Sequence, residues 1–202
     1  MAVFGAKVLH PRTLQPAIRN NIKCWVGCSQ NLKTKTWITK DQHENVSNLR
    51  AMSLRQNQIL LTVKNISNIH MRDFLAKLFN VFAASGIDLD LVTSNNVSTA
   101  IVIDDSQEKL TQESLLTQEL LLELEKFSHV KIERKLSLIA LIGSNMHDNQ
   151  VLKDLLVDFL QTNKVRSIFY GVSSHSICFL LNSVIAKDIA TELHNKLFKE
   201  KK

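Results

Sequence analysis

The chain has 202 residues, of which 45% are hydrophobic and 22% are charged, and its formal net charge is +6. This composition is typical of a globular chain with one or two packed cores, and no apolar run approaches the ~20 residues of a membrane-spanning helix. The basic residues are scattered, apart from the lysine-rich end at 199–202, and are not interleaved with aromatic residues, so neither a nucleic acid nor a membrane is an expected partner. The first residues lack the basic-then-apolar order of a signal peptide, which predicts a cytoplasmic location.

The first 48 residues predict a small folded segment followed by a connection. Residues 12–20 predict a short helix, and the apolar run 22–28 predicts a buried strand. The polar stretch 29–48 is interrupted by Trp37 and Ile38, which indicates one short strand within a domain boundary.

From residue 49 the pattern predicts strands and helices in the order β-α-β-β-α-β, preceded by one extra strand. Both helices carry an apolar stripe at helical spacing, and Gly86 follows the first helix as a stop signal. The predicted segments are the extra strand 49–56, strand 59–63, helix 71–84, strands 87–93 and 97–103, helix 115–127 and strand 130–134.

The pattern then repeats without its last strand. The extra strand 49–56 can supply the missing strand, so we expect the first unit to be inserted within the second. Each unit is then a ferredoxin-like βαββαβ fold, and the fold class is α+β. The uncovered faces predict a homodimer, because pairing two copies buries further apolar surface. The second set comprises strand 136–142, helix 151–160, strands 165–170 and 176–181, and helix 185–198.

The cysteines predict neither a disulfide framework nor a metal site. Cys24, Cys28 and Cys178 form an odd, sparse set. Zinc needs about four ligands, usually in two close pairs, and no second pair follows the first.

No catalytic residue is predicted in this chain. Ser174 and His175 are neighbours in a turn without an orienting acid, which does not favour a nucleophile and its base. Asp104 and Asp105 follow a predicted strand, and we interpret them as part of a solvated loop rather than as cation ligands.

Three motifs resemble the aspartate kinase family. FGAKVLHP at 4–11 is similar to the end of the kinase catalytic domain. SLRQNQ at 53–58, followed by LLTV at 60–63, is similar to the entry to the regulatory region. FYGVSSH at 169–175, followed by CFL at 178–180, resembles the second ACT domain of the lysine-sensitive, Gram-negative type. The resemblance extends from Met1 to about residue 198.

The resemblance implies a regulatory region with two ACT domains behind the end of an amino-acid-kinase domain. Residues 1–48 would be the kinase remnant and linker, 57–135 the first ACT domain, and 49–56 with 136–202 the second. The parent enzyme would phosphorylate L-aspartate with ATP and Mg, the first step towards lysine, threonine and methionine. Lys7 and Val8 would remain from its nucleotide site, and the chain alone would be inactive. A parent fused to diaminopimelate decarboxylase stays an open alternative.

The resemblance also implies a site for L-lysine or another amino-acid effector, near the homodimer interface. The effector carboxylate would meet backbone amides where the first ACT helix begins, and its ammonium groups would meet polar and acidic groups on the next strand. The implied effector residues are Asn68, Met71, Asp73, Phe74, Leu75, Asp88, Leu89, Asp90, Ser94 and Asn96.

Four of these positions depart from the family, which has methionine at Asn68, serine at Met71, glycine at Asp73 and glutamate at Asn96. An aspartate at the helix start satisfies the helix dipole and repels an incoming carboxylate, and loss of the glutamate removes a partner for the lysine side chain. The hypothesis is that lysine binds weakly, that another ligand is sensed, or that feedback is lost. The alternative is that Asp73 turns to solvent or pairs with Arg72 or Lys77, and that the pocket still works.

Two alternatives to an effector-binding module are considered. One is a feedback-insensitive tail that serves oligomer assembly, which the altered positions favour. The other is a free-standing ACT sensor, against which the 4–11 motif argues, because a sensor has no need of a kinase segment.

Overall fold

The computed structural model describes residues 11–29, 31–38, 49–105, 115–146, 150–171 and 173–199. Lys7 and Val8 lie outside these residues, so the expected nucleotide-site remnant stays a prediction. The first described segment consists of helix α1 (Pro11–Arg19) and an antiparallel hairpin of β1 (Cys24–Cys28) and β2 (Asn31–Ile38). Trp25 and Trp37 lie opposite each other in this hairpin, which confirms a strand around Trp37.

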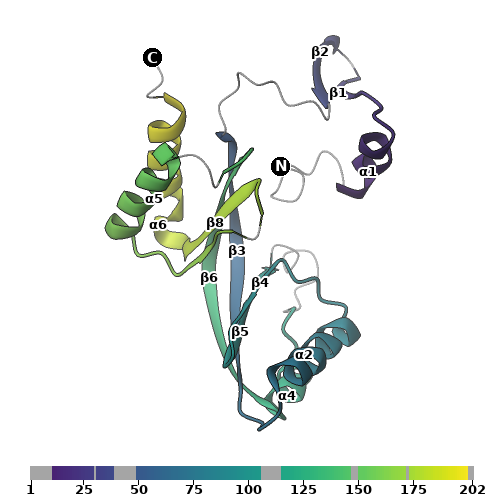
Figure 1. Cartoon of the computed structure of the whole chain (residues 1–202), viewed down its shortest axis with the longest axis vertical. Helices are drawn as coiled ribbons and strands as arrows, with labels where there is room; N and C mark the ends of the chain where they lie inside the picture. Colours follow the sequence, from purple (N-terminus) through teal and green to yellow (C-terminus); the bar gives the residue numbers. More distant parts are fainter. Residues whose placement is uncertain are drawn as a thin grey trace.

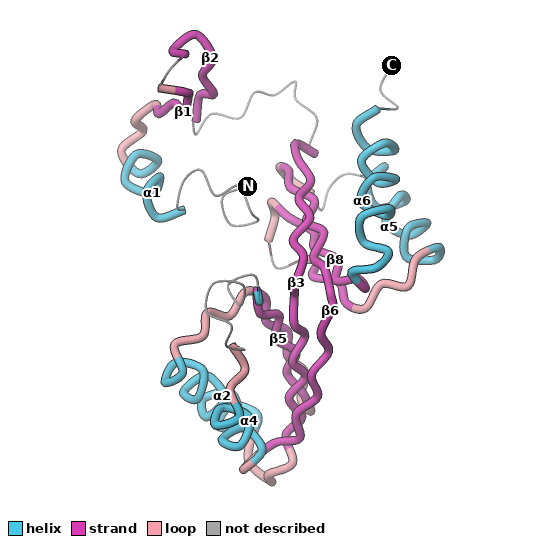
Figure 2. The backbone as a smooth tube through the Cα atoms, turned by 180° about the vertical axis from the view of Figure 1, so that it is seen from behind, coloured by secondary structure: helices cyan, strands magenta, loops and turns pink. Residues whose placement is uncertain are grey.

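The rest of the chain forms a six-stranded antiparallel sheet in the order β4-β5-β3-β6-β8-β7 (Figure 1). One pair of helices lies at each end of the long strands, as Figure 2 shows from behind. The helices are α2 (Met71–Ser85), α4 (Gln118–Glu125), α5 (Gln150–Thr162) and α6 (Ser183–His194), and a π-helix (Asn195–Lys199) follows α6. The strands are β3 (Leu49–Asn65), β4 (Leu91–Ser94), β5 (Ser98–Asp104), β6 (Ser128–Gly143), β7 (Ser167–Phe169) and β8 (Ser176–Asn182).

Strands β3 and β6 each run through both halves of this sheet. The sequence suggested separate strands on either side of residues 57 and 135, but each strand continues through that point. Asn57 and Lys135 have positive φ angles of 56° and 60°, and the β3–β6 register shifts between Arg55 and Gln58. Asparagine tolerates this conformation better than most residues, so the strand bends here without ending. We call the region around Arg55–Gln58 and Lys135 the junction.

Two cores lie on the helix-covered parts of the sheet. In the first half, α2 and α4 pack on β3 and β5, with Phe74, Leu78 and Phe82 fully buried. In the second half, α5 and α6 pack on β6 and β8, where Phe159 meets Phe179 edge to face at 5.1 Å. Burial of each such side chain stabilises the fold by about 1.5–3 kcal/mol.

A third cluster occupies the opposite face of the sheet near the junction. It joins residues of the first half, Leu60 and Val102, to residues of the second half, Leu138 and Leu180. Their strand neighbours Leu61 and Ile139 point to the helix-covered side and are equally buried. Because side chains alternate along a strand, the middle of the sheet is buried on both faces. The two halves therefore share a core as well as two strands.

In the part of the chain that the structure describes, no helix is long and apolar enough to cross a membrane.

Candidate functional site

A polar cavity of about 550 Å³ lies at the end of the first half of the sheet. One wall is the loop between β3 and α2, and the other is the turn between β4 and β5. The lining residues are Asn65, Ile66, Ser67, Asn68, Ile69, His70, Asn96 and Val97.

Two asparagine side chains build the walls. The Asn65 Oδ1 atom accepts hydrogen bonds from the Ser67 amide at 3.1 Å and the Ser67 hydroxyl at 2.9 Å, while its Nδ2 donates to the Ile69 carbonyl. Across the cavity, Asn95 Oδ1 accepts from the Val97 amide at 2.8 Å. Asparagine favours turns in which its side chain accepts a hydrogen bond from the backbone amide two residues later. Asn65 was absent from the predicted set, although an asparagine at a strand end with a serine two residues later was a usable signal.

Asp73 faces Arg72 at the start of α2. The Arg72 Nε atom donates to Asp73 Oδ1 at 3.0 Å, and both side chains are largely exposed. The hydrogen bond from Arg72 is the main reason that the pKa of Asp73 is lowered. The structure thus contains the Arg72 pairing that was one of the expected alternatives, and the Asp73 carboxylate is already partnered.

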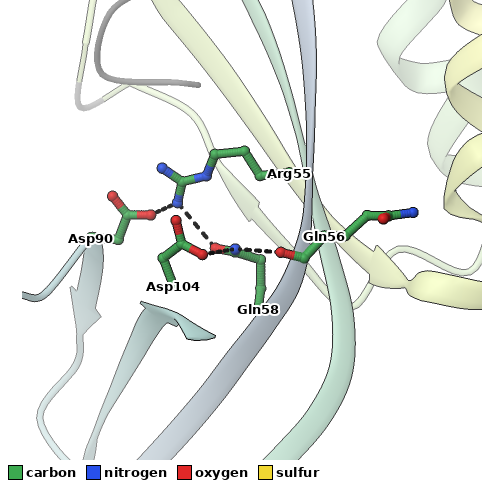
Figure 3. Close-up of polar contacts among 5 residues, drawn as sticks. All are labelled: Arg55, Gln56, Gln58, Asp90 and Asp104. Atoms are coloured by element: carbon green, nitrogen blue, oxygen red, sulfur yellow. Dashed lines mark hydrogen bonds and ion pairs between the residues drawn. The ribbon is translucent and has the colours of Figure 1, made fainter. Parts of the chain in front are cut away.

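Asp90 lies away from the cavity, at the junction, where its carboxylate forms an ion pair with Arg55 (Figure 3). Arg55 also donates to Gln58 Oε1 at 3.0 Å, and Gln58 Nε2 donates to Asp104 Oδ1 at 3.0 Å. Burial lowers the pKa of Arg55, and the nearby Asp104 opposes that shift.

The structure brings together two of the predicted effector residues at the cavity, Asn68 and Asn96. Asp88 is exposed, and the Ser94 hydroxyl lies 3.0 Å from the Thr99 hydroxyl. No carboxylate is among the described residues that line the cavity, and these offer amide, hydroxyl and imidazole groups. The apolar members of the predicted set belong to the first core, with Phe74 fully buried and Met71, Leu75 and Leu89 packed against it.

The interpretation of Asp104 and Asp105 as a solvated loop was wrong. The Asp105 side chain is buried and pairs with Arg134 at 3.4 Å, and Asp104 accepts the hydrogen bond from Gln58. Because β5 extends to Asp104, these carboxylates lie against the junction rather than in a loop. Among the described residues, no group of three or more His, Cys, Asp or Glu side chains could hold a metal ion.

Over 98% of its length, the chain is 39% identical to lysine-sensitive aspartokinase 3 of Escherichia coli K12. The crystal structure of E. coli aspartokinase III with lysine and aspartate in the T-state superposes with a TM-score of 0.83 at 40% identity, covering 98% of this chain and 44% of that one. A C-terminal regulatory domain of aspartate kinase from Porphyromonas gingivalis W83 shares the fold at 21% identity, with a TM-score of 0.59 over 73% of this chain and 96% of that chain. No protein-family model matches the chain.

This chain is similar to the aspartokinases over nearly its whole length. It spans 44% of the length of the E. coli relative. The expected resemblance to the aspartokinases and the α+β fold class are confirmed.

Proposed function

We propose that this chain is the effector-binding and dimerising region of an aspartate kinase, and that the cavity between the β3–α2 loop and the β4–β5 turn receives an amino acid. The observation that carries the proposal is the placement of Asn68 and Asn96, two implied effector residues far apart in sequence, on opposite walls of one cavity. The similarity to lysine-sensitive aspartokinase 3 over nearly the whole chain supports an amino-acid ligand.

The proposed domain division follows the two cores. Residues 57–135 form the first ACT domain around α2 and α4, and 49–56 with 136–202 form the second around α5 and α6. The pairing of Leu49 with Gly143 and of Leu54 with Ile139 supports the assignment of 49–56 to the second domain. Residues 1–48 belong to the kinase domain and its linker. In the whole cytoplasmic enzyme, that domain phosphorylates L-aspartate with ATP and Mg, and Lys7 and Val8 contribute to its nucleotide site.

Lysine is proposed to be a weak ligand of this cavity. Its side-chain ammonium needs an anionic partner, but none of the cavity-lining residues that the structure describes carries a carboxylate. Asp90, an acidic residue of the implied site, is already paired with Arg55. A charged hydrogen bond contributes roughly 1.5–3 kcal/mol, so its absence lowers lysine affinity about tenfold or more.

Calorimetric titration of the full chain tests the proposal. L-lysine, L-threonine, L-methionine and S-adenosylmethionine are compared on the wild type and on Asn96→Glu and Asp73→Gly. We expect Asn96→Glu to bind L-lysine at least about tenfold more tightly, because it places a carboxylate on the cavity wall. Asn195→Glu, which adds the same charge on the exposed end of the second half, is the matched control.

The outcomes distinguish the identity of the ligand from the effector role itself. Micromolar L-lysine binding by the wild type would show that the unaltered cavity suffices, and the weakened-site proposal would be wrong. Binding of another amino acid identifies a different effector. If neither the wild type nor the variants bind any of the four ligands, the effector role is refuted. A dimer that binds nothing then supports the second candidate, a feedback-insensitive assembly tail, which the pairing of Asp90 with Arg55 favours.

A further inference from the structure

Arg55 connects three separate segments of the fold. It lies on β3, just before the left-handed residue Asn57. Its guanidinium contacts Asp90, in the segment between α2 and β4, and the fully buried Gln58, which in turn holds Asp104 at the end of β5 (Figure 3). The Arg55 side chain is 14% exposed and that of Asp90 is 21% exposed. The pair is thus largely removed from water, and removing one residue of such a pair destabilises the fold.

The ion pair crosses the junction. Arg55 pairs with Leu138 in the part of β6 that carries α5 and α6, so its backbone belongs to the second half of the sheet. Asp90 belongs to the first half, because its amide donates to the Val102 carbonyl on β5 at 3.0 Å. Neither half completes this contact alone.

The same contact is tied to the cavity through β4. Asp90 directly precedes Leu91, the first residue of this four-residue edge strand. The other end of β4 is Ser94, followed by the Asn95–Val97 turn that forms one cavity wall. A displacement of that wall can therefore reach Asp90 along one short strand.

We propose that Arg55 and Asp90 form an ionic clasp that couples the β4 edge, and with it the wall of the cavity, to the 49–55 edge of the second half. When the clasp is closed, both edges are held against the junction. When Asp90 moves away, Arg55 keeps Gln58 and the nearby Asp104 but loses its contact with the β4 edge, and the 49–55 edge becomes easier to open. The clasp goes beyond the proposed effector function, because it operates in the chain without a ligand.

Hydrogen–deuterium exchange on the full, ligand-free chain tests this coupling. The variants are Arg55→Gln, Asp90→Asn and the double variant, and the two readouts are the amides of 91–94 and of 49–55. We expect Asp90→Asn to speed exchange in 49–55, and Arg55→Gln to speed exchange in 91–94, each on the order of tenfold. The double variant should exchange no faster than the faster single variant, since the two residues act as one pair.

The matched control is Arg166→Gln, which removes a different arginine whose partner is Glu133 on β6. It should leave exchange in 91–94 unchanged. Faster exchange confined to the mutated half, or effects that add in the double variant, would overturn the proposal. If Arg55→Gln does not fold, the Asp90→Asn variant, which changes a partly exposed residue, is sufficient for the test. The exchange rate of its 49–55 amides then decides the outcome. Because no ligand is present, failure of the clasp and failure of the effector proposal are separate results.

Discussion

Arg166 and Glu133 meet across the junction in a two-point contact. The Arg166 Nε atom donates to Glu133 Oε2 at 2.8 Å, while a second guanidinium nitrogen contacts Oε1. Glu133 lies on β6 in the first half, and Arg166 directly precedes β7 in the second. Such a planar, doubly hydrogen-bonded pair is stronger than an ordinary surface ion pair.

This pair predicts a stability contribution that acid removes. The hydrogen bond from Arg166 lowers the pKa of Glu133 from 4.5 to about 2. A depressed carboxyl pKa stabilises the fold fully above the unfolded value near 4.5, and the contribution falls as the pH drops towards 2. Because the Arg166 side chain is 43% exposed, solvent screening limits the contribution to about 1 kcal/mol.

Glu133→Gln should therefore lower the free energy of unfolding by about 1 kcal/mol at pH 7 and by almost nothing near pH 2. Urea denaturation at pH 7, 4 and 2.5 measures the difference. Lys131→Gln, which removes a longer contact of 3.4 Å to the same carboxylate, should cost less. An equal loss at all three pH values would show that the side chain contributes by packing.

Phe74 should behave as a core residue rather than as a ligand contact. It is fully buried and meets Phe127 edge to face at 5.8 Å. Phe74→Ala should lower the free energy of unfolding by about 3–5 kcal/mol, because a buried ring is lost and a cavity remains. Chemical denaturation measures this loss, with Phe79→Ala on the exposed face of α2 as the control. A loss below about 1 kcal/mol would exclude the packing role.

Gly86 should be required for its backbone conformation alone. It ends α2 at a left-handed φ of 69°, and a Cβ atom placed there would meet nothing within 4 Å. Gly86→Ala should cost about 1–2 kcal/mol through that φ angle. Gly86→Asn should cost less, because asparagine tolerates the left-handed region. Thermal denaturation ranks the two variants, and equal stability of Gly86→Ala and wild type would contradict the assignment.

The cysteines should differ in reactivity. Burial raises the pKa of the Cys178 thiol to about 11, whereas Cys28 is exposed. Because the thiolate is the reactive form, an alkylating reagent at pH 8 should modify Cys28 while Cys178 stays unmodified until the protein unfolds. Peptide mass spectrometry with and without urea measures this, and Cys28→Ser identifies the fast site. Rapid modification of native Cys178 would show that the cluster at the junction opens readily.

The order of strands and helices was predictable because each element carries its own periodicity. The continuity of β3 and β6 was not, since Asn57 and Lys135 read locally as breaks while the strands run on. The strand expected at 87–93 begins at Leu91. Leu91 already pairs with Val102, close to the end of β5 at Asp104, so the residues before it soon run past the strand that could pair with them.

The loops of the candidate site were predictable, but the ion-pair partners of its charged residues were not. Asn68 and Asn96 lie in segments whose local sequence marks a loop and a turn, and the structure places both at one cavity. The partner of Asp90 is a residue of another strand, Arg55, and nothing local to either residue indicates the pairing. Buried ion pairs between distant segments depend on the sheet register, which a single sequence does not reveal.

The long pairing of β3 with β6 also has a consequence for the order in which the chain acquires its structure. The strand pairs near Asn65 and Ser128 close a shorter stretch of chain than the pairs near Leu49 and Gly143. Closing a shorter stretch of chain costs less entropy, so the β3–β6 strand pairs are expected to form first in the first half and then towards the second. During synthesis, the 49–55 segment leaves the ribosome early, yet it waits unpaired until β6 is complete. The first half thus serves as the template on which the second is assembled.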